Sequence, residues 1–326
     1  MNLIVQPNLK EASSHNVVAL ILAIILLSIL LSCSSNASNP DLIYTTAPDE
    51  ISNLINTLNN EYFIFTSGKT EIVTEFKNSN DGFQLLCSGK SHMTYSSRPI
   101  TQSESTYCND SSISFIELPL TTQPIIVATN IANTTTECVT LNDMKNIWSN
   151  PNYLLQGKEI HFYGPPLNSD LYSYLSREFN TGIHNTKHNT NKNNGTLIVD
   201  VINDIHSITF LNYSIYKPYA QYLKALPVSI SNTDCIAPTS SSVNDREYNV
   251  FSTTIFVYLR TDLLKNLYFN KFAQYLLDQQ TIKHIKSANY IPLDSAVYAD
   301  NRNLLKNKTS GSIHIQKNKK SGDINK

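Results

Sequence analysis

Two patterns of apolar and polar residues alternate along the chain from residue 41 onward. One consists of short runs rich in Ile, Val, Tyr, Phe and Thr, which predict strands because these side chains fit a pleated, half-buried surface. Such runs lie at residues 42–46, 62–67, 70–76, 113–118, 124–129, 159–164, 195–202, 207–211 and 251–259. The other pattern is typical of helices and lies at residues 48–59, 82–89, 140–149, 169–180, 213–225 and 264–287.

This alternation of strands and helices predicts an α/β fold with largely parallel sheets. Once a leader is removed, a little under 300 of the 326 residues remain. That length suffices for two lobes or one large domain, and we expect two lobes. Residues 184–194 contain no apolar side chain and predict an exposed loop. The polar and basic residues 301–326 predict a disordered tail.

The first apolar stretch of the chain runs from Val17 to Leu31 without a charge. As a helix it would be ~22 Å long, too short for a ~30 Å bilayer core, which favours a secretory signal over a permanent span. It ends in Leu30-Leu31-Ser32-Cys33, which resembles a bacterial lipobox. We therefore expect residues 1–32 to be a lipoprotein signal peptide, Cys33 to carry lipid, and residues 33–40 to be a polar tether. The alternatives are a plain signal peptide and an N-terminal span with an incidental cysteine.

Composition and motifs limit the classes of function that the chain can have. The net charge is −1, and only 16% of residues are charged. The sequence contains no basic patch that would suggest a nucleic-acid partner. No GxSxG, P-loop, HExxH or kinase motif indicates an enzyme, and no spacing of His and Cys reads as a metal site. We expect no cofactor.

The five cysteines divide into one and four. If Cys33 is lipidated, Cys87, Cys108, Cys138 and Cys235 remain. An even set in an exported chain predicts disulfides, and four cysteines allow three connectivities.

Eight segments in the body of the chain are informative as a series. GFQLLCSGKSHMTYSSRPI (82–100) combines a helix, a turn and a strand that ends in Ser-Ser-Arg-Pro. FIELPLTTQPIIVATN (115–130) spans parts of the predicted strands at 113–118 and 124–129 and resembles one continuous strand of a known family, and HFYGPPLNSDLYSYLSREF (161–179) is a strand, loop and helix. The others are CVTLNDMKNIWS (138–149), YKPYAQYLKALPV (216–228), CIAPTSSSV (235–243), FSTTIFVYL (251–259) and ANYIPL (288–293).

In this order the segments resemble the periplasmic phosphate-binding proteins of phosphate ABC transporters. The resemblance implies a type II binding-protein fold: two lobes, each a mixed, mainly parallel sheet flanked by helices, with a ligand cleft between them. Residues 41–130 and 229–300 would form lobe one, and residues 131–228 lobe two. The chain would be a monomeric lipoprotein on the periplasmic face of a bacterial membrane. It would capture inorganic phosphate for the permease subunits of an importer and perform no chemistry itself.

Within this division, Cys87 and Cys108 flank a segment of lobe one and are the preferred pair. Cys138 and Cys235 lie near the two ends of lobe two, so a bridge across its base is the second expected pair.

The family holds phosphate with backbone N–H groups at helix N-termini and with hydroxyls. Three loops of this chain should converge, and Ser96 and Ser97 should add hydroxyls from a nearby strand end. The expected loop residues are Thr45, Thr46, Asn80, Asp81, Asn168 and Ser169. Asp81 and Asp170 are the candidates for accepting the phosphate proton.

The same loops depart from the family pattern, because most of the family's glycines are replaced in them and only Gly82 remains. Asp170 stands where a glycine would let the backbone approach an anion. At ~4 Å and an effective dielectric of ~20, its charge would repel a second anion by ~4 kcal/mol. Asp170 can also be explained as a helix N-terminal acid favoured by the dipole, and Arg98 as part of a structural ion pair. These departures leave an alternative function: a degenerate surface lipoprotein that binds another solute or a protein.

Overall fold

The computed structural model of the protein describes residues 41–134, 137–150, 152–179, 189–190, 193–229, 234–245, 247–248 and 252–315. The expected signal peptide, Cys33 and the tether lie outside the described residues. So do most of the 184–194 loop and residues 316–326 of the expected tail. Among the residues that are described, no helix has both the length and the apolar character needed to cross a membrane.

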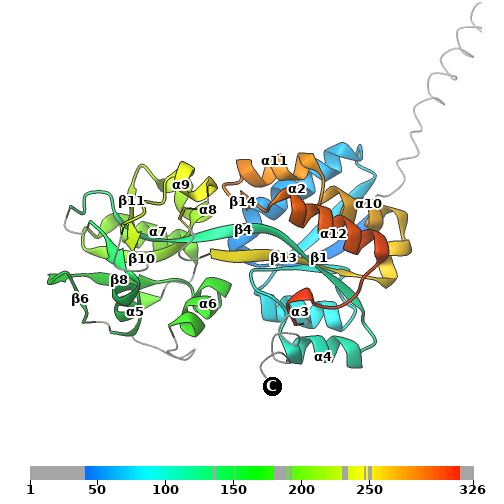
Figure 1. Cartoon of the computed structure of the whole chain (residues 1–326), viewed down its shortest axis with the longest axis horizontal. Helices are drawn as coiled ribbons and strands as arrows, with labels where there is room; N and C mark the ends of the chain where they lie inside the picture. The colour runs from blue at the N-terminus through cyan, green and yellow to red at the C-terminus, as the bar shows by residue number, and fades with distance from the viewer. Residues whose placement is uncertain are drawn as a thin grey trace, which may run out of the picture. The chain divides into compact units, whose positions relative to one another are not determined.

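A ten-stranded mixed sheet runs through the described part of the chain, in the order β2-β1-β3-β13-β4-β10-β8-β9, with β11 and β14 also paired to β4 (Figure 1). Its strands are β1 (Asp41–Ala47), β2 (Thr70–Phe76), β3 (Met93–Ser96), β4 (Phe115–Asn130), β8 (His161–Gly164), β9 (Asn189–Thr190), β10 (Ser207–Asn212), β11 (Leu223–Leu226), β13 (Ser252–Arg260) and β14 (Ile291–Pro292). Two short pairs lie outside it: β5 (Val139–Thr140) with β12 (Val228–Ser229), and β6 (Leu154–Leu155) with β7 (Lys158–Glu159).

The strand β4 links the two lobes of the fold. Its first part, from Phe115 to Pro124, pairs with β13, and its second part pairs with β10 and β11. All these pairings are antiparallel, so the sheet is more evenly mixed than the alternating pattern predicts. The long strand expected at 115–130 is confirmed.

Two large hydrophobic cores lie on either side of this link. Leu118 and Leu120 of β4 belong to one core, with side chains from β1, β13 and the helices α2 (Ser52–Phe65) and α10 (Leu267–Tyr275). Ile126 and Val127 belong to the other core, around Trp148 and Phe210. Two cores joined by a shared strand give the two-lobed α/β fold that the sequence predicts. The expected lobe boundaries, 41–130 plus 229–300 and 131–228, stay a prediction.

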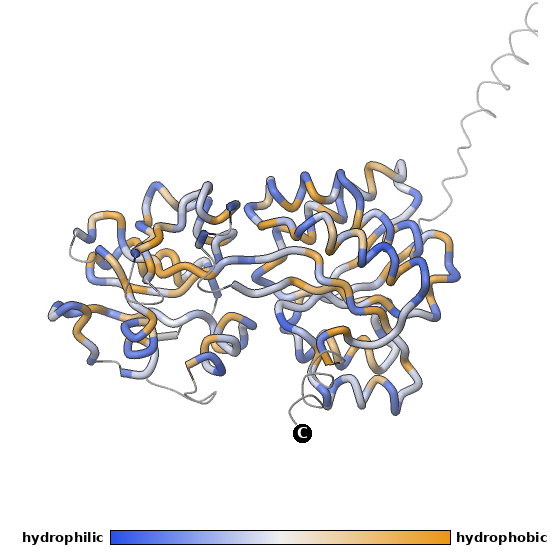
Figure 2. The backbone as a smooth tube through the Cα atoms, viewed as in Figure 1, coloured by the Kyte–Doolittle hydropathy of each residue, from blue (hydrophilic) through white to orange (hydrophobic). Residues whose placement is uncertain are grey.

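Helices cover the sheet, and their tubes alternate between apolar and polar stretches, as expected for helices with one buried face (Figure 2). The α-helices are α2 (Ser52–Phe65), α3 (Ser79–Cys87), α4 (Gln102–Asp110), α5 (Leu141–Ser149), α6 (Asp170–Glu178), α7 (Asn194–Asn203), α8 (Tyr213–Tyr216), α9 (Ser240–Asn244), α10 (Leu267–Tyr275), α11 (Gln279–Ser287) and α12 (Ser295–Asn307). Short 3-10 helices are η1 (Asp49–Ile51), η2 (Lys217–Tyr219) and η3 (Asp262–Lys265).

Two of the predicted strands are helical. Residues 195–202 form α7, because Asn193 caps the helix at the N–H of Thr196 and the apolar residues Leu197, Ile198 and Val201 are buried at helical spacing. Residues 62–65 of the run at 62–67 form the last turn of α2. In α7 the β-branched residues serve a buried helix face, which the run of apolar letters alone does not distinguish from a strand. In residues 62–65 only Tyr62 is buried, so the apolar run there does not mark a buried strand.

Two predicted helices are interrupted. The helix expected at 213–225 ends early, around Pro218, and the chain then forms β11 against β4. The helix expected at 264–287 is divided, because Asp278 caps the new helix α11 by accepting the N–H groups of Gln280 and Thr281.

The disordered tail expected from residue 301 is wrong over residues 301–315. Helix α12 continues to Asn307, with Leu305 in the core and the amide of Asn301 donating to the carbonyl of Pro119. The N–H of Gly311 then donates to the carbonyl of Phe115, at 2.8 Å. The segment reads as disordered because most of its residues are polar, although these few contacts hold it against lobe one.

Both expected disulfides are confirmed. Cys87 bridges to Cys108, and Cys138 bridges to Cys235. Cys87 and Cys108 belong to a small third cluster of buried residues beneath α3 and α4.

Candidate functional site

The N-terminus of α3 is set close against the sheet. Asn78 caps the helix, with its side-chain oxygen accepting the N–H of Asp81 at 3.0 Å. The helix can approach β1 and β3 because residue 82 is glycine. A Cβ at Gly82 would lie 2.6 Å from Oγ1 of Thr94 and 3.1 Å from Oγ1 of Thr46. This close packing presents the buried Ser79, the first residue of α3, toward the other lobe.

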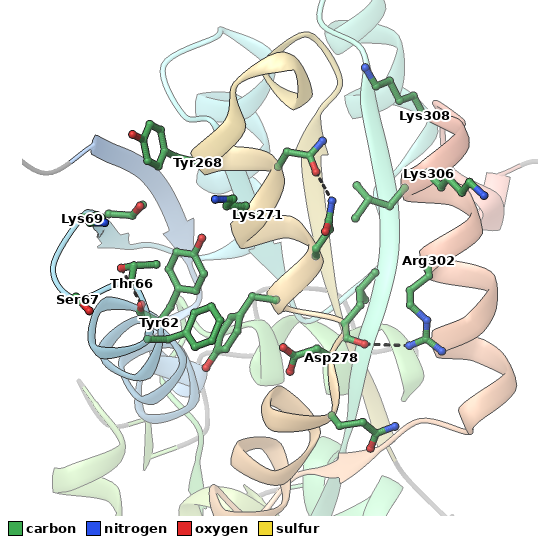
Figure 3. A pocket seen from close by; sticks show the side chains of 18 residues that line it. Tyr62, Thr66, Ser67, Lys69, Tyr268, Lys271, Asp278, Arg302, Lys306 and Lys308 are labelled. Atoms are coloured by element: carbon green, nitrogen blue, oxygen red, sulfur yellow. Dashed lines mark hydrogen bonds between the residues drawn. The ribbon is translucent and has the colours of Figure 1, made fainter.

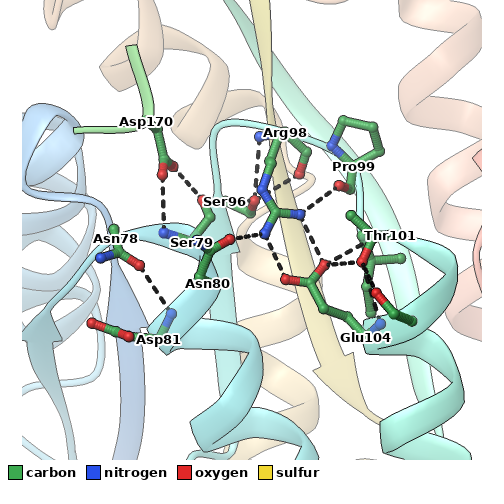
Figure 4. Close-up of polar contacts among 12 residues, drawn as sticks. Asn78, Ser79, Asn80, Asp81, Ser96, Arg98, Pro99, Thr101, Glu104 and Asp170 are labelled. Carbon is green, nitrogen blue, oxygen red and sulfur yellow. Dashed lines mark hydrogen bonds and ion pairs between the residues drawn. The ribbon is translucent and has the colours of Figure 1, made fainter. Parts of the chain in front are cut away.

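The carboxylate of Asp170 binds to this helix end from the second lobe. One of its oxygens accepts the N–H of Ser79 at 3.1 Å, and the other accepts the Ser79 hydroxyl (Figure 4). Oγ of Ser79 in turn accepts the N–H of Ser97 at 3.2 Å and lies 2.8 Å from Oγ of Ser96. A negatively charged group therefore already sits where helix dipole and donors favour an anion.

Glu50 makes the reciprocal contact. Its Oε1 accepts the N–H groups of Asp170 at 2.8 Å and Leu171 at 3.3 Å, at the start of α6. The next N–H of that helix, from Tyr172, donates to the capping side chain of Ser169 at 3.0 Å. Each lobe thus supplies a carboxylate to a helix N-terminus of the other lobe.

The protonation of Glu50 follows from its surroundings. Burial first, and then the nearby charge of Asp170, raise the pKa of Glu50 from 4.5 to about 8, although hydrogen bonds from backbone N–H groups oppose the shift. At neutral pH Glu50 therefore holds a proton.

Arg98 is engaged in a structural ion pair. Its guanidinium donates two hydrogen bonds to Glu104, at 2.9 and 2.5 Å, and a third to Asn80 at 2.5 Å, and it lies 5.0 Å above the ring of Phe83. Burial works against its charge, but Glu104 and the nearby Asp170 together raise the pKa of Arg98. Arg98 thus adds positive potential beside Asp170 while its hydrogen bonds hold the turn after β3.

The structure brings together only part of the expected site. Ser96, Ser97 and Ser169 lie at the meeting of α3 and α6, close to Asp170. Other expected residues lie elsewhere. Thr45 and Thr46 are buried in β1, and Asn80, Asp81 and Asn168 are exposed, with the side chain of Asn80 turned to Arg98.

The sequence reasoning missed two residues, Ser79 and Glu50. Ser79 lies in the second expected loop, directly after a residue that can cap a helix, and this capping signal marks it as the first helical residue. Glu50 lies two positions after Pro48, in the first turn of a predicted helix, where an acid usually serves its own helix dipole. Nothing local indicates that it caps a helix about 120 positions away.

A cavity of about 340 Å³ lies beside Glu50, between the lobes. It is lined from lobe one by residues 49–50, 52–53 and 290, and from lobe two by residues 193–195 and 214–215. A larger hollow of about 1210 Å³ lies away from this cleft, between α2, α10 and α12, and carries Lys69, Lys271 and Lys306 (Figure 3). Nowhere in the described ranges do three or more His, Cys, Asp or Glu residues cluster as metal ligands.

Comparison with known proteins identifies the family. The family model described as a PBP superfamily domain matches residues 36–280 of the chain. The chain belongs to the PBP superfamily.

Curated relatives are similar at a distance. Protein SphX of Synechocystis is 25% identical over 219 residues, which is 62% of this chain and 64% of that protein, less than two thirds of its length. The phosphate-binding protein PstS of Staphylococcus aureus is 23% identical over 236 residues, which is 70% of this chain and 69% of that protein.

Solved structures share the fold of this PBP-superfamily chain. A structure described as a possible phosphate binding protein from Planctomyces limnophilus has a TM-score of 0.62 at 20% identity, covering 83% of this chain and all of that one. An ABC-type phosphate transport receptor from Vibrio cholerae has a TM-score of 0.62 at 16% identity, covering 77% of this chain and all of that one. These are type II periplasmic binding proteins, the fold class that the sequence predicts.

Proposed function

We propose that the chain is the substrate-binding component of an ABC importer and captures phosphate between its two lobes. The observation that carries the proposal is the set of donors at the start of α3. The N–H and hydroxyl of Ser79 converge on the carboxylate of Asp170, an anion supplied from the opposite lobe. An oxyanion of similar charge could take these donors in place of that carboxylate. Relatives named as phosphate-binding proteins support phosphate as the anion.

The anion would be held without a metal or a cofactor, and the chain would perform no chemistry. The first turn of α3 would supply a backbone N–H, and Ser79, Ser96 and Ser97 would surround it with hydroxyls. Closure of the lobes around the ligand would then present both of them to a permease, and the energy for transport would come from the importer's ATPase subunits.

Export and anchoring complete the proposal. The apolar stretch from Val17 to Leu31 and the lipobox-like Leu-Leu-Ser-Cys sequence support export of the chain and its lipid anchoring on the periplasmic face of a bacterial membrane. Mass spectrometry of Cys33 in the exported protein tests this part, because a free thiol or an uncleaved leader would contradict it.

Titration calorimetry tests phosphate capture directly. The chain from residue 34 onward contains all three hydrophobic clusters, so it retains what the fold needs. We expect saturable heat with phosphate and much weaker heat with sulfate, which has no proton to give. Absence of heat with phosphate at millimolar concentration would contradict the proposal and leave the fold unaffected.

One observation favours a second candidate function. Glu50 already occupies the N-terminus of α6, and Asp170 already occupies the N-terminus of α3. A binding protein whose own carboxyl groups occupy these helix N-termini could instead serve as a surface lipoprotein that binds another solute or a protein. The same titration, repeated with cationic and neutral solutes, separates the two candidates.

A further inference from the structure

Two carboxylates cross the cleft in opposite directions. Glu50 lies in η1, beside Ile51 and the core of lobe one, yet it binds the N-terminus of α6. Asp170 lies at the start of α6, beside Leu171 and the core of lobe two, yet it binds the N-terminus of α3. Each side chain therefore connects two separately packed bodies.

The preference of acids for their own helix N-terminus does not account for this arrangement. A dipole-favoured acid interacts with the first turn of the helix that carries it. Here the first turn of α6 is served by Glu50 from the other lobe, while Asp170 turns away to serve Ser79 of α3. The exchange buries two carboxyl groups, and it gives the two lobes four direct hydrogen bonds to each other.

One donor at the site is unused. Oγ of Ser97 is buried, with 8% of the residue exposed, and has no hydrogen-bond partner among the described residues. Its backbone N–H donates to Oγ of Ser79, and Ser79 in turn donates to the Asp170 carboxylate. A carboxylate offers two oxygens, whereas a tetrahedral oxyanion offers four. The hydroxyl of Ser97, whose residue contacts Ser79, is therefore a buried donor that the present occupant does not use.

We infer that Glu50 and Asp170 form an internal latch of two carboxyl groups, which closes the two lobes on each other without ligand and which an incoming oxyanion must displace. The inference rests on the proposed function for the identity of the oxyanion, but the closure itself needs no ligand. In the latched protein the two carboxyl groups act as specificity determinants. They reject any anion that cannot replace their hydrogen bonds, and they lower the affinity for one that can.

Small-angle X-ray scattering on the chain from residue 34 tests the closure without any ligand. We compare the wild-type chain with the double variant Glu50→Ala/Asp170→Ala. The control is Glu71→Gln/Glu178→Gln, which neutralises one exposed acid on each lobe, away from the starts of α3 and α6. We expect the wild-type and control chains to be compact and the double variant to have a larger radius of gyration. Equal radii for all three chains would overturn the latch. Should the double variant fail to fold, Asp170→Asn, which keeps the shape and removes the charge, provides the same comparison.

Titration of the same proteins with inorganic phosphate tests the displacement. We expect the double variant to bind phosphate at least about tenfold more tightly than the wild-type chain and to become compact as it binds. Weaker or equal binding by the double variant would overturn the role of the carboxylates as competitors. A larger radius of gyration in the double variant, together with no phosphate binding in any chain, would support the latch and contradict the proposed function. The latch and the proposed function can therefore be tested independently.

Discussion

Asp170 and Ser79 are 91 positions apart in the sequence, and both the N–H and the hydroxyl of Ser79 donate to the carboxylate of Asp170. This contact joins the first residue of α6 to the first residue of α3, across the two lobes. It identifies the start of α3 as an anion-binding position and Asp170 as its present occupant.

The Ser79 hydroxyl should contribute substantially to phosphate affinity. Ser79→Ala removes a donor to a charged group, an interaction worth about 1.5–3 kcal/mol. We therefore expect phosphate affinity to fall by about tenfold or more. Ser88→Ala is the matched control, because Ser88 caps the other end of the same helix and its hydroxyl bonds only to the local carbonyl of Leu85. Equal affinities for the two variants, measured by calorimetry, would remove Ser79 from the site.

The raised pKa of Glu50 makes stability depend on pH with a definite sign. The folded pKa of about 8 lies above the ordinary value of 4.5, so the folded state binds this proton more tightly than the unfolded chain does. The stabilisation is complete below about pH 4.5 and is lost as the pH rises through about 8. The slope is at most about 1.4 kcal/mol per pH unit.

Urea denaturation of Glu50→Gln at several pH values isolates this contribution. Glutamine keeps an acceptor oxygen for the N–H groups of α6 but does not titrate. We expect the wild-type chain to lose stability relative to the Gln variant across that pH range, while Asp49→Asn follows the wild type. Parallel curves for the wild-type and Gln chains would show that Glu50 is not protonated in the folded protein.

The fold was more accessible from the sequence than the site was. The long strand at 115–130, the Ser-Ser-Arg-Pro turn and both disulfides follow from local patterns and from the resemblance of ordered segments. In contrast, residues 195–202 read as a strand because a buried helix face can carry the same β-branched residues.

The carboxylate exchange had no local signal at all. Asp170 could be recognised as an acid at a helix start, and its conflict with an anion could be calculated. Ser79 and Glu50 come into contact with Asp170 only because the two lobes meet in the folded protein. No spacing between residues in the sequence predicts these contacts. Arg98, which the sequence allowed as part of a structural ion pair, is held by Glu104, six positions away.

Gly82 should be intolerant of even the smallest side chain. A Cβ at this position would lie 2.6 Å from Oγ1 of Thr94, so Gly82→Ala requires either the buried Thr94 side chain or α3 to shift. We expect a loss of about 1–3 kcal/mol of unfolding free energy. Gln84→Ala, on the exposed face of the same helix, should change stability by less than about 0.5 kcal/mol. Similar urea midpoints for the two variants would contradict the close packing that positions Ser79.

The two disulfides should differ in their contribution to stability. Cys138 and Cys235 are separated by 97 positions, whereas Cys87 and Cys108 are separated by 21. In the loop-entropy description, the longer loop contributes about 4–5 kcal/mol and the shorter about 3 kcal/mol. Replacing each pair by serines and measuring urea denaturation should therefore show the larger loss for the Cys138–Cys235 pair. The reverse order would show that packing in the small cluster around Cys87 outweighs loop entropy.

A crystal structure of the chain from residue 34, grown in millimolar phosphate, tests the central claim most directly. The account predicts a tetrahedral anion at the N–H and hydroxyl of Ser79, with the hydroxyl of Ser97 engaged and the carboxylate of Asp170 displaced from α3. The account would be contradicted by a structure in which Asp170 remains on Ser79 and phosphate is bound elsewhere or not at all.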